Sequence, residues 1–110
     1  MPPRPRILRL TLEDAPFNVT RTGEKVIEVR EFSDWIWGRL HNSATGEPRD
    51  YDFIQYYNAN CFTLHEAVCV VRYRGWFWLN EPLHLGPYST GFQVSFDGPV
   101  FVICHGGVVL

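Results

Sequence analysis

Three charged side chains that could take part in chemistry lie close together in the chain: Lys25, Glu28 and Arg30. Glu28 and Arg30 are two positions apart, so on a strand they share one face. A carboxylate can accept a hydrogen bond from a base amino group, and a guanidinium can donate to a phosphate or carbonyl oxygen. Lys25 can bind the same oxygens or act as a base in a water-poor site. The alternatives are an exposed ion pair, which contributes little to stability, and a solvated lysine at the start of a strand.

A second candidate group consists of Trp35, Trp37 and Arg39. Ser33 and Asp34 precede it and predict the start of a short helix. An indole face beside a guanidinium can stack on an unpaired base, which is worth about 1–3 kcal/mol per base. Because residues two apart lie about 200° around a helix axis, we expect one tryptophan to be buried and the other exposed.

Tyr57 and Asn58 form a third candidate group, at the end of a strand predicted over residues 51–57. An asparagine amide can read a base edge, and a tyrosine ring can stack on the base. The alternative is a structural turn in which Asn58 adopts the left-handed conformation.

The cysteines predict neither a metal site nor a disulfide framework. Cys61, His65 and Cys69 are four residues apart, and on a helix they would share one face and suggest zinc. Cys69, however, alternates with valines in a β-branched run, so a strand with a buried structural cysteine is the better interpretation. With Cys104 the cysteines number three, and this odd count without a recognisable signal peptide predicts reduced thiols in an intracellular protein, cytoplasmic or nuclear. We expect no metal and no cofactor.

The composition predicts one folded domain. The 110 residues are 45% hydrophobic and 15% aromatic, which supplies enough apolar surface for a core. Residues 1–6 (MPPRPR) predict a flexible tail, and residues 7–110 the domain. The net charge of −2 argues against a protein that coats extended duplex DNA, because many phosphates would have to be neutralised. No apolar run approaches the roughly 20 residues of a membrane-spanning helix, so we expect no membrane partner.

Alternation and turn residues predict a mixed α+β fold. Two short helices are expected near the N-terminus, one from Glu13 or Asp14 to about Thr22, ended by Gly23, and one starting at Ser33. The predicted strands are residues 7–12, 25–32, 51–57, 67–78, 91–96 and 100–104, and residues 42–50 predict a loop.

Glycines and aromatic residues refine this arrangement in the second half of the chain. Gly75 predicts a bend in the long strand 67–78, and Asp97-Gly98 predicts a hairpin turn between the last two strands. Residues 76–78 are Trp-Phe-Trp, so their alternating faces must leave at least one ring exposed. Five to six strands and two short helices are most simply arranged as a small mixed β-barrel with the helices packed at its end.

Residues 17–30 (FNVTRTGEKVIEVR) resemble the signature of the ASCH domain family. That signature is an aromatic residue on a short helix, then G-x-K, then a strand ending in E-x-R. The matching residues are Phe17, Gly23, Lys25, Glu28 and Arg30.

The resemblance continues in order along one branch of the family and covers roughly residues 7–110. The further matching segments are Arg30-Glu31, Trp35 to Arg39-Leu40, Tyr51-Asp52-Phe53-Ile54 and Tyr56-Tyr57-Asn58. One departure follows Asn58, where Ala59-Asn60 stand in place of the branch's glycine and aromatic residue.

The resemblance implies a fold similar to the PUA domain, a small mixed β-barrel with helices at its openings. It implies a module that binds a nucleotide or single-stranded RNA in a small charged cleft. The ligand-binding residues it implies are Lys25, Glu28, Arg30, Trp35, Trp37, Arg39, Tyr57 and Asn58.

Two alternatives to a binding module stay open. Some small bacterial relatives deacetylate 4-acetylcytidine with a lysine, a threonine and a glutamate, and at least one family member is a ribonuclease. The lysine matches Lys25, the threonine position holds Glu28, and the glutamate has no counterpart that can be placed. An amidohydrolase for a modified nucleoside such as N(4)-acetylcytidine would use Lys25 to activate water or as the nucleophile, and Glu28 to move the proton. The other alternative is a protein-interaction module with an exposed aromatic rim at residues 76–78.

Overall fold

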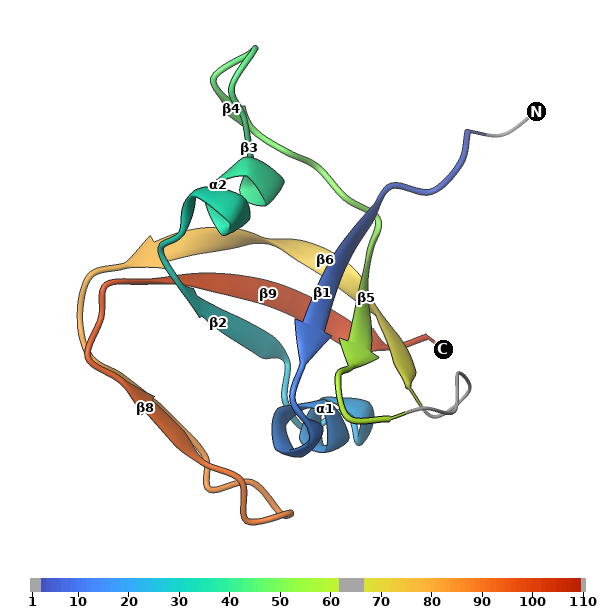
Figure 1. Cartoon of the computed structure of the whole chain (residues 1–110), viewed down its shortest axis with the longest axis vertical. Helices are drawn as coiled ribbons and strands as arrows, with labels where there is room; N and C mark the ends of the chain where they lie inside the picture. The colour runs from blue at the N-terminus through green and yellow to red at the C-terminus, as the bar shows by residue number, and fades with distance from the viewer. Residues whose placement is uncertain (1–2, 62–66, 110) are drawn as a thin grey trace.

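The computed structural model of the protein describes residues 3–61 and 67–109. The chain forms a five-stranded sheet that curls into a half-barrel (Figure 1). In spatial order its strands are β1 (Ile7–Leu12), β5 (Phe53–Asn58), β6 (Val68–Leu79), β9 (Val100–Val108) and β2 (Ile27–Glu31). β1 runs parallel to β5, and the other neighbouring pairs are antiparallel. The predicted small α+β fold is confirmed at this level.

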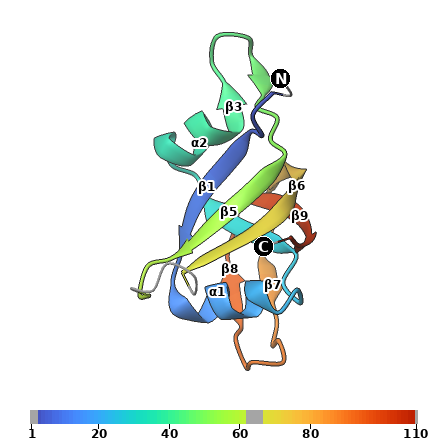
Figure 2. The same cartoon turned by 90° about the vertical axis from the view of Figure 1, so that its right-hand side faces the viewer.

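Two helices lie at opposite ends of the curled sheet (Figures 1 and 2). One end carries α1 (Asp14–Arg21), and the other carries α2 (Asp34–Leu40). Two short hairpins complete the described fold: β3 (His41–Asn42) with β4 (Glu47–Pro48), and β7 (Leu83–Leu85) with β8 (Val94–Phe96).

The main core fills the concave face of the sheet because apolar side chains alternate in phase along its strands. On β1, Leu8, Leu10 and Leu12 are buried, while Arg9 between them is exposed. Phe17 joins this cluster from α1, so the helix covers one end of the core. Burying an aromatic side chain of this kind contributes roughly 1.5–3 kcal/mol relative to leaving it exposed.

A second apolar cluster lies on the other face of β2 and β9. Phe101 and Ile103 belong to the main core, whereas Val100 and Val102 belong to the second cluster. Leu85 of the β7–β8 hairpin packs there too. The hairpin therefore covers the face that the half-barrel turns away from its main core.

The local signals around the two helices are confirmed. Gly23 follows α1 with a φ of 85°, in the left-handed region where glycine is favoured. Ser33 caps α2, and its hydroxyl oxygen accepts a hydrogen bond from the Ile36 backbone N–H at 3.1 Å. Gly75 has a φ of 98° and lies where the β6–β9 register shifts, between Tyr73 and Trp76. The predicted bend in this strand is thus a β-bulge.

The predicted hairpin at Asp97-Gly98 is wrong, because β8 pairs with β7 whereas β9 pairs with β6 and β2. Gly98 serves a different purpose there. A Cβ at this position would lie 2.6 Å from the carbonyl oxygen of Glu81, so glycine allows the chain to pass close to the loop before β7. The three-residue strand β7 was not predicted, and the expected loop at residues 42–50 contains most of the short β3–β4 hairpin.

Within the described residues, no helix has both the length and the apolar character needed to span a membrane.

Candidate functional site

The three charged residues singled out from the sequence converge at the inner face of β2. Glu28 pairs with Ile103, and Arg30 pairs with Phe101. Because directly paired residues lie on the same side of a sheet, both charged side chains share the concave face with core residues. Lys25 comes just before the strand and is also buried, with 2% of its surface exposed. The prediction that Glu28 and Arg30 share a face is confirmed, and that face points inward.

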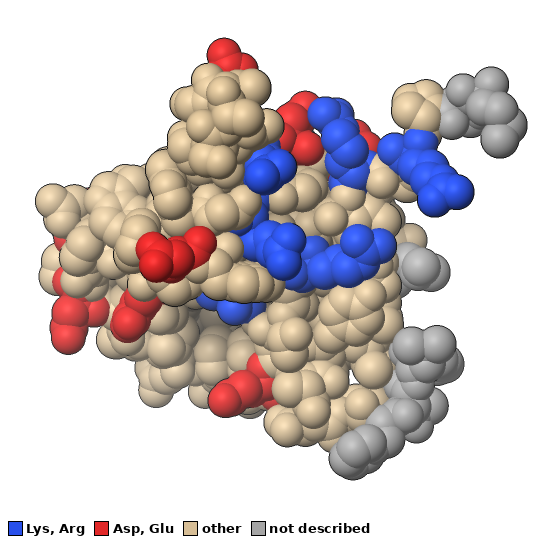
Figure 3. Space-filling model, turned by 45° about the horizontal axis from the view of Figure 1, so that its top comes forward, with Lys and Arg blue, Asp and Glu red and all other residues tan. Residues whose placement is uncertain are grey.

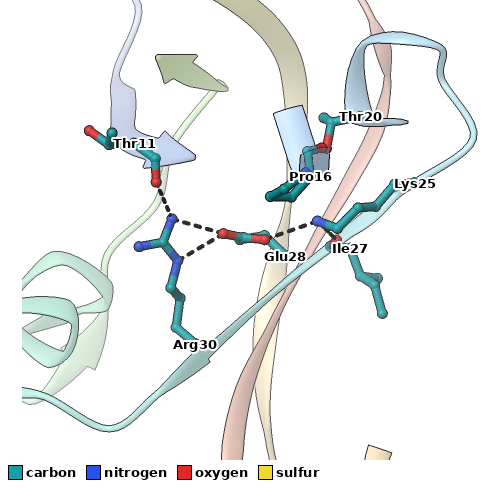
Figure 4. Close-up of polar contacts among 7 residues, drawn as sticks. All are labelled: Thr11, Pro16, Thr20, Lys25, Ile27, Glu28 and Arg30. Carbon is teal, nitrogen blue, oxygen red and sulfur yellow. Dashed lines mark hydrogen bonds and ion pairs between the residues drawn. The ribbon is translucent and has the colours of Figure 1, made fainter. Parts of the chain in front are cut away.

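A single carboxylate joins the two cations (Figure 4). Lys25 Nζ lies 2.9 Å from Glu28 Oε1 and also donates to the backbone oxygen of Ile27 at 2.6 Å. On the other side, Nε and one terminal nitrogen of Arg30 each lie 2.8 Å from Glu28 Oε2. Such charge-assisted contacts are stronger than neutral hydrogen bonds, and the three side chains together keep one net positive charge.

Arg30 also crosses the open side of the half-barrel. β1 and β2 are the two edge strands of the sheet, so no backbone ladder joins them. The same terminal nitrogen of Arg30 donates to the backbone oxygen of Thr11, on β1, at 2.8 Å. A side chain thus supplies the link that backbone pairing would supply in a closed barrel.

Tyr56 and His105 are two further polar residues beside this cluster, and neither is among the ligand-binding residues predicted from the sequence. Their rings meet edge to face, with centroids 5.7 Å apart. Neither the Tyr56 hydroxyl nor His105 Nε2 has a hydrogen-bond partner among the described residues. An unsatisfied buried polar atom is costly, so each of these two atoms calls for a physical explanation.

The charges of the cluster act on both of these residues. Burial, and next the Glu28 carboxylate, raise the pKa of the Tyr56 phenol well above its ordinary value. Burial lowers the pKa of His105, and the Lys25 charge lowers it further, against the opposing effects of the Gly106 carbonyl and Glu28. His105 is therefore favoured as a neutral imidazole.

A cavity of about 250 Å³ opens beside Lys25 and Glu28. Its walls come from the start of α1, from β2 and from the β7–β8 hairpin. The other lining residues are Leu12, Glu13, Pro16, Val29, Leu85, Phe92, Val94 and Phe96. Mostly apolar walls exclude water and so strengthen the attraction between the charged groups and a polar ligand.

The structure places Trp35, Trp37 and Arg39 around other cavities. Trp35 is 52% exposed, and the Arg39 guanidinium lies over its ring, 4.9 Å from the centroid. Trp37 is half-buried and stacks on the His41 ring, with the two ring centroids 4.2 Å apart. Trp35 is thus the exposed tryptophan of the prediction, whereas Trp37 packs against the core but is half-buried rather than buried. None of the three residues lines the cavity beside Lys25.

Asn58 and Tyr57 differ in what they can offer a ligand. Asn58 is buried and donates from Nδ2 to the Asp14 carboxylate at 3.0 Å, while its Oδ1 accepts from the Asn60 N–H at 2.9 Å. Its amide therefore anchors the start of α1 to the end of β5. Asn58 does not adopt the left-handed conformation that the alternative required. Tyr57 is half-buried and points to the opposite face of the strand.

The cysteine that was predicted to be buried in a strand is Cys69. It is buried, and burial raises the pKa of its thiol. His65 lies outside the described residues, and within residues 3–61 and 67–109 no group of three or more His, Cys, Asp or Glu side chains could hold a metal ion.

The aromatic residues 76–78 on β6 were predicted to leave at least one ring exposed. Phe77 and Trp78 are 48% and 43% exposed, so this prediction is confirmed.

Comparisons of the chain with models of protein families, with curated proteins and with solved structures give no match. What the site does must therefore be inferred from its geometry. A signal for Tyr56 and His105 does exist in the sequence, since both occupy strand positions in phase with buried neighbours. It could not be used without the strand order, which places β5 and β9 on either side of β6 in one sheet.

Replacing Glu28 by alanine should strongly destabilise the protein. The change leaves the buried Lys25 charge without its carboxylate, and removing one partner of a buried pair costs about 3–5 kcal/mol. Urea unfolding followed by circular dichroism measures the loss. Glu31→Ala is the matched control, because Glu31 is exposed and should change stability by no more than about 0.5 kcal/mol. Equal losses for the two variants would contradict this account of Glu28.

His105 should make the protein less stable in mild acid. Its folded pKa is lowered by burial, whereas an unfolded histidine titrates near about 6.5, so the unfolded chain binds a proton first as the pH falls. The contribution of neutral His105 to stability is complete above about pH 6.5 and is lost as the pH falls through the pKa of His105 in the folded protein. Between pH 7 and 5, wild type should lose more unfolding free energy than His105→Gln.

The exposed His84 supplies the control for this pH effect. His84→Gln should retain the steep fall in stability that His105→Gln removes. Parallel pH profiles for wild type and His105→Gln would show that burial of His105 does not destabilise its charged form.

Proposed function

We propose that this protein is a small ASCH-like domain with a PUA-like barrel that binds a nucleotide or a short segment of single-stranded RNA. The observation that carries the proposal is the buried Lys25–Glu28 pair at the wall of a 250 Å³ cavity, with the half-buried Arg30 bound to the other carboxylate oxygen of Glu28. The cavity is slightly smaller than the roughly 300–1,000 Å³ of typical small-molecule sites, and like them it has few polar groups among apolar walls. The sequence resemblance to the ASCH family supports the same interpretation independently of the cavity.

The hydrogen bonds already made determine what remains for a ligand. Lys25 uses two contacts, to Glu28 and to Ile27, and an ammonium has three N–H donors. Arg30 bonds through Nε and one terminal nitrogen, and its other terminal nitrogen makes no hydrogen bond to the described residues. These donors suit phosphate or carbonyl oxygens, while the Glu28 carboxylate can accept from a base amino group or a sugar hydroxyl.

A second candidate function, hydrolysis of an N-acylated nucleoside, is favoured by the close contact of Lys25 with Glu28. In this reaction, a water oxygen bonds to the acyl carbon, the C–N bond breaks, and the products are the free nucleoside and a carboxylic acid. Glu28 would take the proton from water and pass it to the leaving nitrogen. Lys25 donates to two oxygens in the structure, which suits stabilisation of a developing oxyanion better than nucleophilic attack.

Binding can be tested with fluorescein-labelled octauridylate by fluorescence anisotropy at low salt. We expect Lys25→Met to weaken binding about tenfold and to reduce the dependence of log K on log salt by about 0.7, because one phosphate contact is lost. Arg74→Gln is the control, since Arg74 is exposed on β6 and lines neither this cavity nor its mouth. A wild-type protein that does not bind at low salt would exclude this function for the probe.

Hydrolysis can be tested by incubating the protein with 4-acetylcytidine and separating the products by chromatography. If the second function holds, cytidine appears with wild type and with Arg74→Gln, and Lys25→Ala and Glu28→Gln each abolish it, since both groups act on the reacting atoms. Absence of cytidine with folded wild-type protein would remove this activity for this substrate. The binding function would be unaffected by that result.

A further inference from the structure

A groove separate from the Lys25 cavity lies between β1 and α2. It has a volume of about 450 Å³ and is lined by Ile7, Leu8, Arg9, Trp35, Arg39 and Tyr51. We call it the β1–α2 groove. Lysine and arginine side chains gather in a band across the face of the molecule shown in Figure 3. Arg9 and Arg39 are the two cations that line the groove itself.

The positive charge of the β1–α2 groove is not neutralised from within the described structure. Neither Arg9 nor Arg39 forms an ion pair with a described residue, and no carboxylate lines the groove. Arg6, three positions before Arg9, is by contrast paired with Asp50 at 3.2 Å. Two guanidinium groups in one hollow repel each other and attract an anion, although the whole chain carries a net charge of −2.

Aromatic contacts hold one of these cations in place. The Arg39 guanidinium lies over the Trp35 ring, 4.9 Å from the centroid, and Trp35 is still 52% exposed. The Tyr51 hydroxyl donates to the backbone oxygen of Arg39, which ties the end of α2 to the chain just before β5. A positioned guanidinium beside an exposed indole combines a phosphate ligand with a stacking surface for a base.

The β1–α2 groove and the Lys25 cavity are neighbours along one strand. Arg9 lines the groove and Leu12 lines the cavity, and both belong to β1. Three residues of strand span about 10 Å. Between them, Arg30 reaches across from β2 to the Thr11 carbonyl. Linked nucleotides are long enough to span this separation along β1.

We infer that the β1–α2 groove is a second nucleic-acid subsite, in which Arg9 and Arg39 bind phosphodiester groups of a single-stranded RNA and Trp35 stacks on a base. This inference rests on the proposed function, in that the same RNA places one nucleotide in the Lys25 cavity. It identifies the ligand as an oligonucleotide, because a free mononucleotide cannot occupy both positions.

Two probes separate the subsites: labelled octauridylate can occupy both, whereas uridine monophosphate can occupy only one. Anisotropy measures octauridylate binding between roughly 50 and 200 mM salt, and competition measures the monophosphate. Arg9→Gln and Arg39→Gln should each weaken octauridylate binding about five- to tenfold and reduce the salt slope by about 0.7. Both variants should bind the monophosphate as wild type does, whereas Lys25→Met should weaken binding of both probes.

Two control variants test charge and geometry. Arg74→Gln removes the same charge from an exposed position on β6 and should leave octauridylate binding within about twofold of wild type. Arg39→Lys keeps the charge and should retain the salt slope, but it loses part of the affinity because the planar group over Trp35 is gone.

The outcomes distinguish the two proposals. Octauridylate binding that Lys25→Met weakens but that Arg9→Gln and Arg39→Gln leave unchanged would overturn the second subsite and keep the proposed function. Loss of octauridylate binding in the arginine variants alone, with no effect of Lys25→Met, would overturn the role of the Lys25 cavity and keep the groove as an RNA site. A wild-type protein that binds neither probe would overturn both.

Discussion

The shared carboxylate of Glu28 is the interaction on which the rest of the site depends. It lies between two cations, 2.9 Å from Lys25 Nζ and 2.8 Å from two nitrogens of Arg30. Without it, a lysine that is 2% exposed would face an apolar interior with only a backbone carbonyl as partner. With it, Arg30 is oriented to reach Thr11 and to join the two edge strands of the half-barrel. The groups that can bind a ligand are thus also those that hold the open side together.

This coupling has a physical consequence for binding. Lys25 and Glu28 are buried, so an anion that enters the cavity interacts with the Lys25 charge through a medium of low polarity. The Tyr56 hydroxyl and His105 Nε2 lie in the same interior without partners among the described residues. Neither residue lines the cavity itself.

The two ends of the half-barrel have different chemistry. At the α1 end, the helix start and the β7–β8 hairpin form apolar walls beside Lys25 and Glu28. At the α2 end, Trp35 and Trp37 line separate hollows, one cationic and one aromatic. The edge strand β1 passes from one end to the other, and the RNA strand that we propose would follow it.

Short-range features were determined by the sequence alone. Period-two alternation placed Glu28 and Arg30 on one face, the cap chemistry of Ser33 set the start of α2, and helix geometry separated Trp35 from Trp37. Each of these features depends only on residues within about one helical turn or a few strand positions, so it can be predicted from the local spacing of residue types in the sequence.

Only the tertiary structure decided which way the charged face points and what it meets. Glu28 and Arg30 face inward because β2 pairs with β9, a strand about 70 positions later in the chain. The strand order also places Tyr56 and His105 beside them and pairs β8 with β7 instead of β9. In the folded protein Arg39 lines a different cavity from Lys25. Local periodicity carries no information on which distant strand becomes a neighbour, since that choice is made by burial of the whole core.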